Sequence, residues 1–152
     1  MKPVSSSLAD ELVQLSREIH ADPELAYQER RAAARIASLI ERHGVPVQMG
    51  IGGLATAFRA RVGPPGPSVA LLAEYDALAG VGHGCGHNLI AMTNVGAFLR
   101  VASETDLGMA VELIGTPAEE DGGGRSISSA PASSTTSRSR SLRIPPRRGA
   151  GA

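Results

Sequence analysis

Several residue types that commonly stabilise small proteins are scarce in this sequence. Its 152 residues contain no tryptophan, only 3% aromatic residues and one cysteine, Cys85. A single cysteine excludes a disulfide within the chain and leaves the thiol available as a ligand or a nucleophile. No apolar run reaches the roughly 18 residues that a membrane-spanning helix needs, and the first residues lack the apolar stretch of a signal peptide. We therefore expect a cytoplasmic protein with no membrane partner and a core of Leu, Ile, Val and Ala.

Acidic residues are absent from one end of the chain. Residues 125–152 contain six arginines and eight serines but no Asp or Glu, so the net charge of zero divides into about −6 before this segment and +6 within it. The segment has neither helical nor strand periodicity, and its composition buries too little apolar surface to offset the entropy of ordering. We predict a disordered Arg/Ser-rich tail at 125–152 and one folded unit at 1–124.

The apolar pattern of residues 1–124 predicts an α/β fold. Spacings of three and four residues indicate helices at 5–20, 27–43 and 86–103, and short apolar segments between turn residues indicate strands at 46–49, 54–62, 68–74 and 110–115. The continuous apolar run from Val69 to Ala73 is typical of a strand buried on both faces of a sheet. Helices and strands in this order favour a layered α/β domain.

Polar side chains follow the strand at 68–74. Glu74, Tyr75 and Asp76 lie where this strand leaves the sheet. Ligands of open α/β sheets bind outside the carboxyl ends of the strands, so this cluster is well placed for a site. A solvated strand end with no function is the alternative.

The segment Gly-His-Gly-Cys-Gly-His-Asn at 82–88 carries two good ligands for zinc and similar metals, Cys85 and His87. The interleaved glycines allow a tight turn that brings both side chains toward one point. The helix expected to begin here favours a thiolate at its N-terminus. We do not expect a closed structural zinc site, because it needs four ligands and one cysteine is present. The alternative is a glycine-rich turn with a buried cysteine and surface histidines.

Two adjacent carboxylates, Glu119 and Glu120, follow the strand at 110–115. Such a pair can divide the work of amide hydrolysis, one binding a metal and the other moving a proton from metal-bound water to the leaving nitrogen. On its own, Glu-Glu is also typical of a solvated helix start. The three polar clusters together favour a metal site, because they lie at the ends of two buried strands and the start of the helix between them.

These segments together resemble the zinc-dependent aminoacylase and carboxypeptidase family of metallopeptidases and amidohydrolases. The similar segments, which also match in order and spacing, are Glu18-Ile19-His20 with Pro23-Glu24-Leu25, then Glu74-Tyr75-Asp76-Ala77-Leu78, residues 82–88, and Pro117-Ala118-Glu119-Glu120. The resemblance covers about residues 8–124 and points to the aminoacylase-like dipeptidase subgroup. It implies a three-layer catalytic domain that hydrolyses the amide bond of dipeptides or small N-acyl amino acids.

The resemblance also implies roles for individual residues. Cys85, His87 and Glu120 would be ligands in a site for two ions, zinc or another divalent metal such as manganese or cobalt. Glu119 would be the general base and acid. Asp76 matches a catalytic-site aspartate that steadies a metal-binding histidine in much of the family, although Glu74 stands here in that histidine's place. We expect no ligand role for His83.

The sequence departs from the family in length and in its histidines. Family members are about two to three times longer, have further histidine ligands downstream of the Glu-Glu motif, and contain a lid domain that mediates dimerisation. All four histidines here lie at or before His87. We therefore expect an incomplete catalytic domain without the lid, strands ending at Glu74 and Gly115 that lack neighbours, and little or no activity. The alternative is a non-catalytic fragment that binds metal weakly or associates with a partner chain.

The break in composition after Gly124 indicates that the tail at 125–152 is not family sequence, and we expect a truncated or frame-shifted product. A rival interpretation is that its arginines bind nucleic acid through phosphate contacts. The tail has no aromatic residue for stacking on bases. We therefore do not expect a nucleic acid partner.

Overall fold

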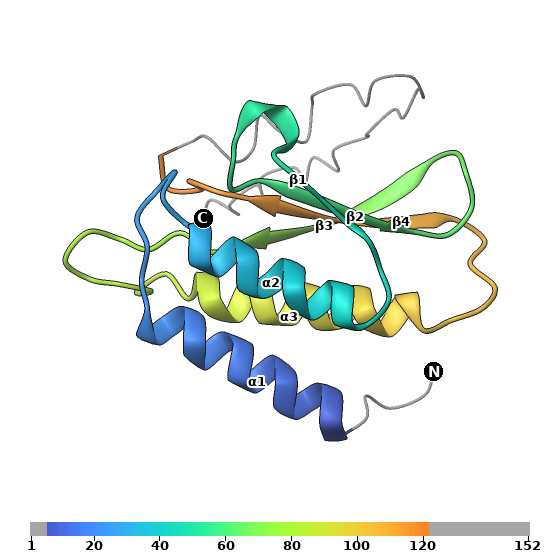
Figure 1. The fold of residues 1–152 in the computed structure, drawn as a ribbon, viewed down its shortest axis with the longest axis horizontal. Coiled ribbons are helices and arrows are strands. Elements are labelled where there is room, and N and C mark those ends of the chain that lie inside the picture. The colour runs from blue at the N-terminus through green and yellow to red at the C-terminus, as the bar shows by residue number, and fades with distance from the viewer. Residues whose placement is uncertain (1–5, 122–152) are drawn as a thin grey trace, which may run out of the picture.

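The computed structural model describes residues 6–121 (Figure 1). Its elements are α1 (Ser6–Ala21), α2 (Arg30–Arg42), β1 (Val47–Met49), the short 3-10 helix η1 (Ile51–Gly53), β2 (Phe58–Val62), β3 (Ser68–Glu74), α3 (His87–Ala102) and β4 (Ala110–Thr116). This mixture of helices and one sheet confirms the predicted α/β class. The predictions for the tail at 125–152 lie outside the described residues. None of the described helices is long and apolar enough to cross a membrane.

The four strands form one sheet in the order β1-β2-β4-β3. β2 pairs antiparallel with both β1 and β4, whereas β3 and β4 are parallel, with Glu74 opposite Thr116. Helix α3 connects these two parallel strands, as such a crossover requires. The carboxyl ends of β3 and β4 therefore lie side by side at one edge of the sheet.

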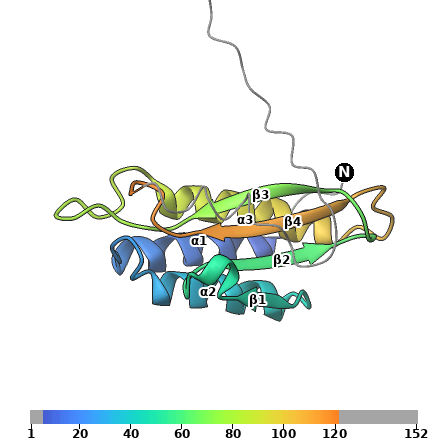
Figure 2. The same cartoon turned by 90° about the horizontal axis from the view of Figure 1, so that it is seen from above.

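The three α-helices lie on one side of the sheet, opposite the short η1 (Figures 1 and 2). α2 and α3 pack against the strands, and α1 packs mainly on α3. The apolar stripe predicted for the first helix is the buried face of α1. The main hydrophobic core of the described residues includes this face of α1 and contains Leu8, Leu12, Leu15, Ile19, Ile36, Ile40, Phe58, Tyr75, Val95, Phe98 and Leu113.

Phe58 of β2 packs closely against both Tyr75 and its partner residue in β4, Gly115. The Phe58 ring stacks on Tyr75 with centroids 5.9 Å apart. A Cβ added at Gly115 would lie 2.1 Å from a carbon of the Phe58 ring, so only glycine fits there. The absence of a side chain at Gly115 thus lets β4 lie close to the Phe58 ring.

The expectation that the strand at 68–74 is buried on both faces is wrong. Val69 is 51% exposed, and only Ala73 of this strand is fully buried. β3 is an edge strand of the described sheet, and the described helices cover one face only. The other face carries η1 and a small cluster that includes Ile114 and Leu72. Within residues 6–121, β3 lacks a second neighbour as expected, but the same expectation for the strand ending at Gly115 is wrong, because β4 lies between β2 and β3.

Two predicted boundaries are also corrected. The helix expected from Tyr27 begins at Arg30, because Tyr27 has a left-handed backbone with φ of 63° that no α-helix accommodates. The strand expected from Leu54 begins at Phe58, since the chain turns from Leu54 to Ala57 with a hydrogen bond from the Ala57 amide to the Leu54 carbonyl oxygen.

Candidate metal centre

Three elements bring the predicted site residues together at one edge of the sheet. Asp76 follows the end of β3, His87 is the first residue of α3, and Glu119 and Glu120 follow β4. Because β3 and β4 are parallel, both carboxyl ends point to this edge, where ligands bind in open α/β sheets. The structure thus brings together clusters that are separated by up to 44 positions in the chain.

His87 is oriented by Asp76. The His87 side chain is almost fully buried, and its Nδ1 lies 2.9 Å from the main-chain oxygen of Asp76 and 3.0 Å from Oδ1 of the same residue. A carbonyl oxygen can only accept, so Nδ1 carries the proton in this hydrogen bond. In the neutral imidazole the other nitrogen, Nε2, then holds a lone pair, as in metal-ligating histidines whose second nitrogen donates to a protein oxygen.

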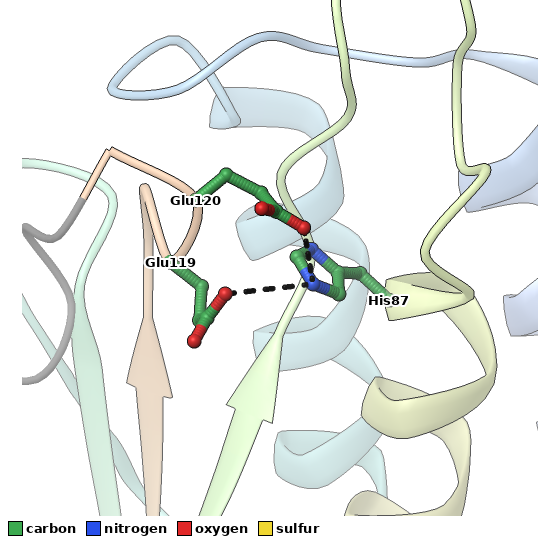
Figure 3. Close-up of side chains that lie close together, drawn as sticks. All are labelled: His87, Glu119 and Glu120. Atoms are coloured by element: carbon green, nitrogen blue, oxygen red, sulfur yellow. Dashed lines mark ion pairs between the residues drawn. The ribbon is translucent and has the colours of Figure 1, made fainter.

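Carboxylates surround Nε2 of His87 (Figure 3). Glu120 Oε1 lies 3.7 Å away and Glu119 Oε2 4.0 Å away, and Glu74 Oε2 lies 3.9 Å away from the β3 side. One ligand atom each from His87, Glu119 and Glu120 lie within 4.8 Å of one another. Ligands at about 2.0–2.2 Å from a zinc ion are roughly 3–4 Å apart. The donor types and spacing therefore fit a divalent ion with small side-chain adjustments.

A left-handed residue and a buried acid direct the two glutamates toward His87. Ala118 has φ of 56° and turns the chain sharply after β4. The Glu120 amide then donates to Asp76 Oδ2 at 3.3 Å. Asp76 therefore contacts both the histidine and the backbone of the Glu-Glu motif. The alternative of a solvated helix start does not describe this turn, because no helix begins here in the described chain.

Cys85 lies beside this group, outside the three residues whose ligand atoms lie within 4.8 Å of one another. The thiol is exposed and in hydrogen-bonding contact with Glu120. That hydrogen bond, partial desolvation and the negative charges of neighbouring acids raise the pKa of the Cys85 thiol. The helix N-terminus is expected to favour a thiolate, whereas the hydrogen bond to Glu120 and the neighbouring acids shift the pKa of Cys85 in the opposite direction in the metal-free protein.

The alternative interpretation of residues 82–88 placed the cysteine inside and the histidines at the surface, and the structure has the opposite arrangement. Cys85 is exposed, whereas His83 and His87 are buried. His83 lies against His20, with ring centroids 6.2 Å apart, and burial lowers the pKa of its imidazole. It stays outside the His87 group.

Two buried acids near the site carried no predicted role. Glu24 accepts hydrogen bonds from the Arg31 and Ala32 amides and so caps the start of α2. Glu29 is completely buried and accepts a hydrogen bond from the Ala118 amide at 2.9 Å. No periodicity marks either residue. Glu24 belongs to a segment that resembles the family, which was the only signal available.

No family model matches the sequence, but individual proteins do. The chain is 46% identical to a mouse (Mus musculus) Xaa-Arg dipeptidase over 132 residues, which cover 77% of this chain and 31% of that protein. It is 37% identical to thermostable carboxypeptidase 2 of Saccharolobus solfataricus over 133 residues, covering 76% of this chain and 34% of that protein.

A solved structure agrees with these matches. A dinuclear metal binding peptidase of the M20 family from Bacillus subtilis superposes with a TM-score of 0.70 and 25% identity, covering 76% of this chain and 37% of that one. The chain spans about a third of the length of the curated relatives it matches. The sequence identity, the fold and the grouping of His87 with Glu119 and Glu120 all lead to the same family. The chain belongs to the M20 family of metal-dependent peptidases and amidohydrolases.

Proposed function

We propose that this chain contributes one part of a divalent metal centre that hydrolyses the amide bond of dipeptides or small N-acyl amino acids. The observation that carries the proposal is the orientation of His87. Its Nδ1 is held by Asp76, and its Nε2 is directed at the carboxylates of Glu119 and Glu120. A surface cluster of acids would not need a buried histidine fixed in this way.

The residues would divide the work as follows. His87, Glu120 and Cys85 would hold the ion, zinc in our proposal, and the Cys85 thiol would lose its proton on binding. When bound, such an ion supplies the positive charge that lowers the pKa of a coordinated water and polarises the amide carbonyl. Glu119 would accept the proton of the attacking water and deliver it to the leaving nitrogen.

The difference in exposure between the Glu119 and Glu120 side chains supports this assignment of roles. The Glu119 side chain is 16% exposed and the Glu120 side chain 36% exposed. A more enclosed carboxylate is better placed to hold a proton between the two transfers, because fewer water molecules compete for it. Asp76 would fix His87 and the Glu120 amide and would not touch the substrate.

The names of relatives support the proposed substrate class. The mouse protein's name gives dipeptides with a C-terminal arginine, and the Saccharolobus protein is a carboxypeptidase. Both activities cleave an amide bond next to a terminal amino acid. We extend to this chain only that shared chemistry.

We further propose that this chain alone has little or no turnover. The Bacillus protein binds two metal ions, whereas the described residues of this chain contain one three-residue ligand group. A second candidate function is non-catalytic association with another chain, for which the exposed edge of β3 is the favouring observation.

Zinc titration calorimetry tests the proposed function. The wild type should bind close to one zinc ion per chain, and His87→Ala should lower the affinity by about 100-fold, since it removes a ligand. Glu41→Gln removes an exposed carboxylate from α2 and should leave the affinity unchanged. Equal zinc affinity in the wild type and His87→Ala would refute the proposed centre. A dipeptide hydrolysis assay on the same samples would refute low turnover if the rate matched that of the longer relatives.

A further inference from the structure

Glu29 is a buried carboxylate at the junction of three segments. It is completely buried at the start of α2. Its Oε1 accepts hydrogen bonds from the Tyr27 amide at 2.8 Å and from the Ala118 amide at 2.9 Å. Its Oε2 accepts a hydrogen bond from the Thr56 hydroxyl at 3.1 Å. The carboxylate therefore connects the α1–α2 loop, the turn before β2 and the segment after β4.

The two amides that share Oε1 belong to unusual backbone positions. Tyr27 and Ala118 are the non-glycine residues with positive φ in the described chain, at 63° and 56°. L-residues rarely adopt this conformation, which persists only where surrounding contacts fix it. One oxygen atom stabilises both positions at once.

Ala118 immediately precedes the Glu-Glu motif. Its amide is held by Glu29, and the Glu120 amide is held by Asp76 Oδ2. Glu119 therefore lies between two amides that are each anchored by a buried acid. This arrangement fixes the backbone from which the Glu119 side chain extends toward His87 (Figure 3).

The hydrogen-bond donors that face Glu29 explain how a carboxylate is accommodated at this buried position. Burying an acid is unfavourable unless several donors satisfy it. Its oxygens accept hydrogen bonds from the Tyr27 amide, the Ala118 amide and the Thr56 hydroxyl. Glu29 therefore connects the start of α2 to the segment that carries Glu119.

We propose that Glu29 is a positioning residue of the metal centre, which holds the Ala118 amide so that the carboxylates of Glu119 and Glu120 face Nε2 of His87. The inference rests on the proposed function. It assigns to Glu29 no contact with substrate or metal.

The main variants are Glu29→Asp, which keeps the charge but is one methylene too short to reach the Ala118 amide, and Glu29→Ala, which removes the acceptor. Glu29→Gln is the conservative variant, since its amide oxygen can still accept from Ala118. Thr56→Val is the matched control, because it removes the hydroxyl on Oε2 and leaves the Oε1 contacts intact. Leu39→Ala, in the buried core of α2, controls for lost stability.

Two measurements separate positioning from folding. The first is titration with cobalt(II), which reports affinity and, through the absorption spectrum at saturation, ligand geometry. Loss of a positioning contact should weaken the affinity of Glu29→Asp and Glu29→Ala by about 10-fold or more and change the saturated spectrum. Glu29→Gln should stay within a few-fold of the wild type, and Thr56→Val and Leu39→Ala should keep the wild-type spectrum.

The second measurement is hydrogen exchange at the Ala118 amide in the metal-free protein. Exchange should accelerate in Glu29→Asp relative to Thr56→Val and Leu39→Ala. Wild-type cobalt affinity and spectrum in Glu29→Asp, or unchanged protection of Ala118, would overturn the inference. If the wild type itself bound no cobalt or zinc, the proposed function would fail, while the exchange of Ala118 would still decide whether Glu29 holds this turn. If Glu29→Ala does not fold, Glu29→Asp carries both measurements.

Discussion

The Nδ1 atom of His87 lies 2.9 Å from the main-chain oxygen of Asp76, and this contact turns Nε2 toward the carboxylates of Glu119 and Glu120. Asp76 also accepts the Glu120 amide through Oδ2. A single residue at the end of β3 thus fixes the imidazole from α3 and the backbone after β4. The family resemblance gave Asp76 the role of steadying a metal-binding histidine, and the histidine that Asp76 contacts in this structure is His87.

Replacement of Asp76 should weaken metal binding without removing a ligand. Asp76→Ala removes Oδ1 beside His87 and Oδ2 beneath the Glu120 amide. Changes to residues that orient ligands typically lower metal affinity by about 10- to 100-fold. Zinc titration should show this loss, with Asp106→Ala, in the loop before β4, as the control. An Asp76→Ala variant with wild-type affinity would contradict the orienting role.

The two glutamates should respond differently to amide substitution. Glu120→Gln should lower zinc affinity by about 10-fold or more, since it replaces a charged ligand by a neutral one. Glu119→Gln should change the affinity less, because the proposed role of Glu119 is proton transfer. Parallel titrations of the two variants provide the comparison. Equal losses would assign both carboxylates to the metal, and a larger loss for Glu119→Gln would reverse the roles.

Glu29 should make stability depend on pH. Burial raises the pKa of the Glu29 carboxyl above its usual value in the folded protein. The folded state then binds a proton more tightly than the unfolded state, so this group's contribution to stability is largest below the unfolded pKa and decreases as pH rises through the folded pKa. Glu29→Gln cannot ionise and should lack this decrease.

Urea denaturation across pH 4–8 measures the effect as the difference in unfolding free energy between Glu29→Gln and the wild type. The difference should shift in favour of Glu29→Gln as pH rises. A difference that stays constant, or shifts toward the wild type, would show that the hydrogen bonds to Glu29 favour its ionised form more than burial disfavours it.

Gly115 should tolerate no side chain. A Cβ there would overlap the Phe58 ring, which is fully buried and stacked on Tyr75. Overpacking of this kind costs about 1–3 kcal/mol, so Gly115→Ala should lower the free energy of unfolding by that amount or more. Gly108→Ala is the control, since a Cβ at Gly108 meets no atom within 4 Å. Equal stability of the two variants would mean that β4 can shift away from the ring.

The sequence predicted which residues meet at the carboxyl edge of the sheet, because turn residues and apolar periodicity located the strands and the helix that carry them. Turn residues bound the strand at 68–74, and its observed bounds agree with the prediction. The periodic apolar residues Ala91, Val95 and Phe98 place α3 correctly, and they lie in its buried face. Parallel strands joined by a helix then bring Asp76, His87 and Glu119 to one edge by geometry alone.

Other features depend on contacts that no local pattern encodes. The exposure of Val69 follows from the strand order, which places β3 at the edge of the described sheet. The left-handed backbone of Tyr27 and Ala118 depends on Glu29, which lies 89 positions before Ala118. The raised pKa of Cys85 depends on Glu120, so the helix dipole alone gave the wrong direction.

Crystals grown with zinc provide the most direct test of the central claim, because anomalous diffraction at the zinc edge locates the ion without assumptions about its ligands. We predict an ion within about 2.0–2.2 Å of His87 Nε2 and of a Glu120 carboxylate oxygen. Ordered zinc only at other positions, with Nε2 of His87 not coordinated, would contradict the account.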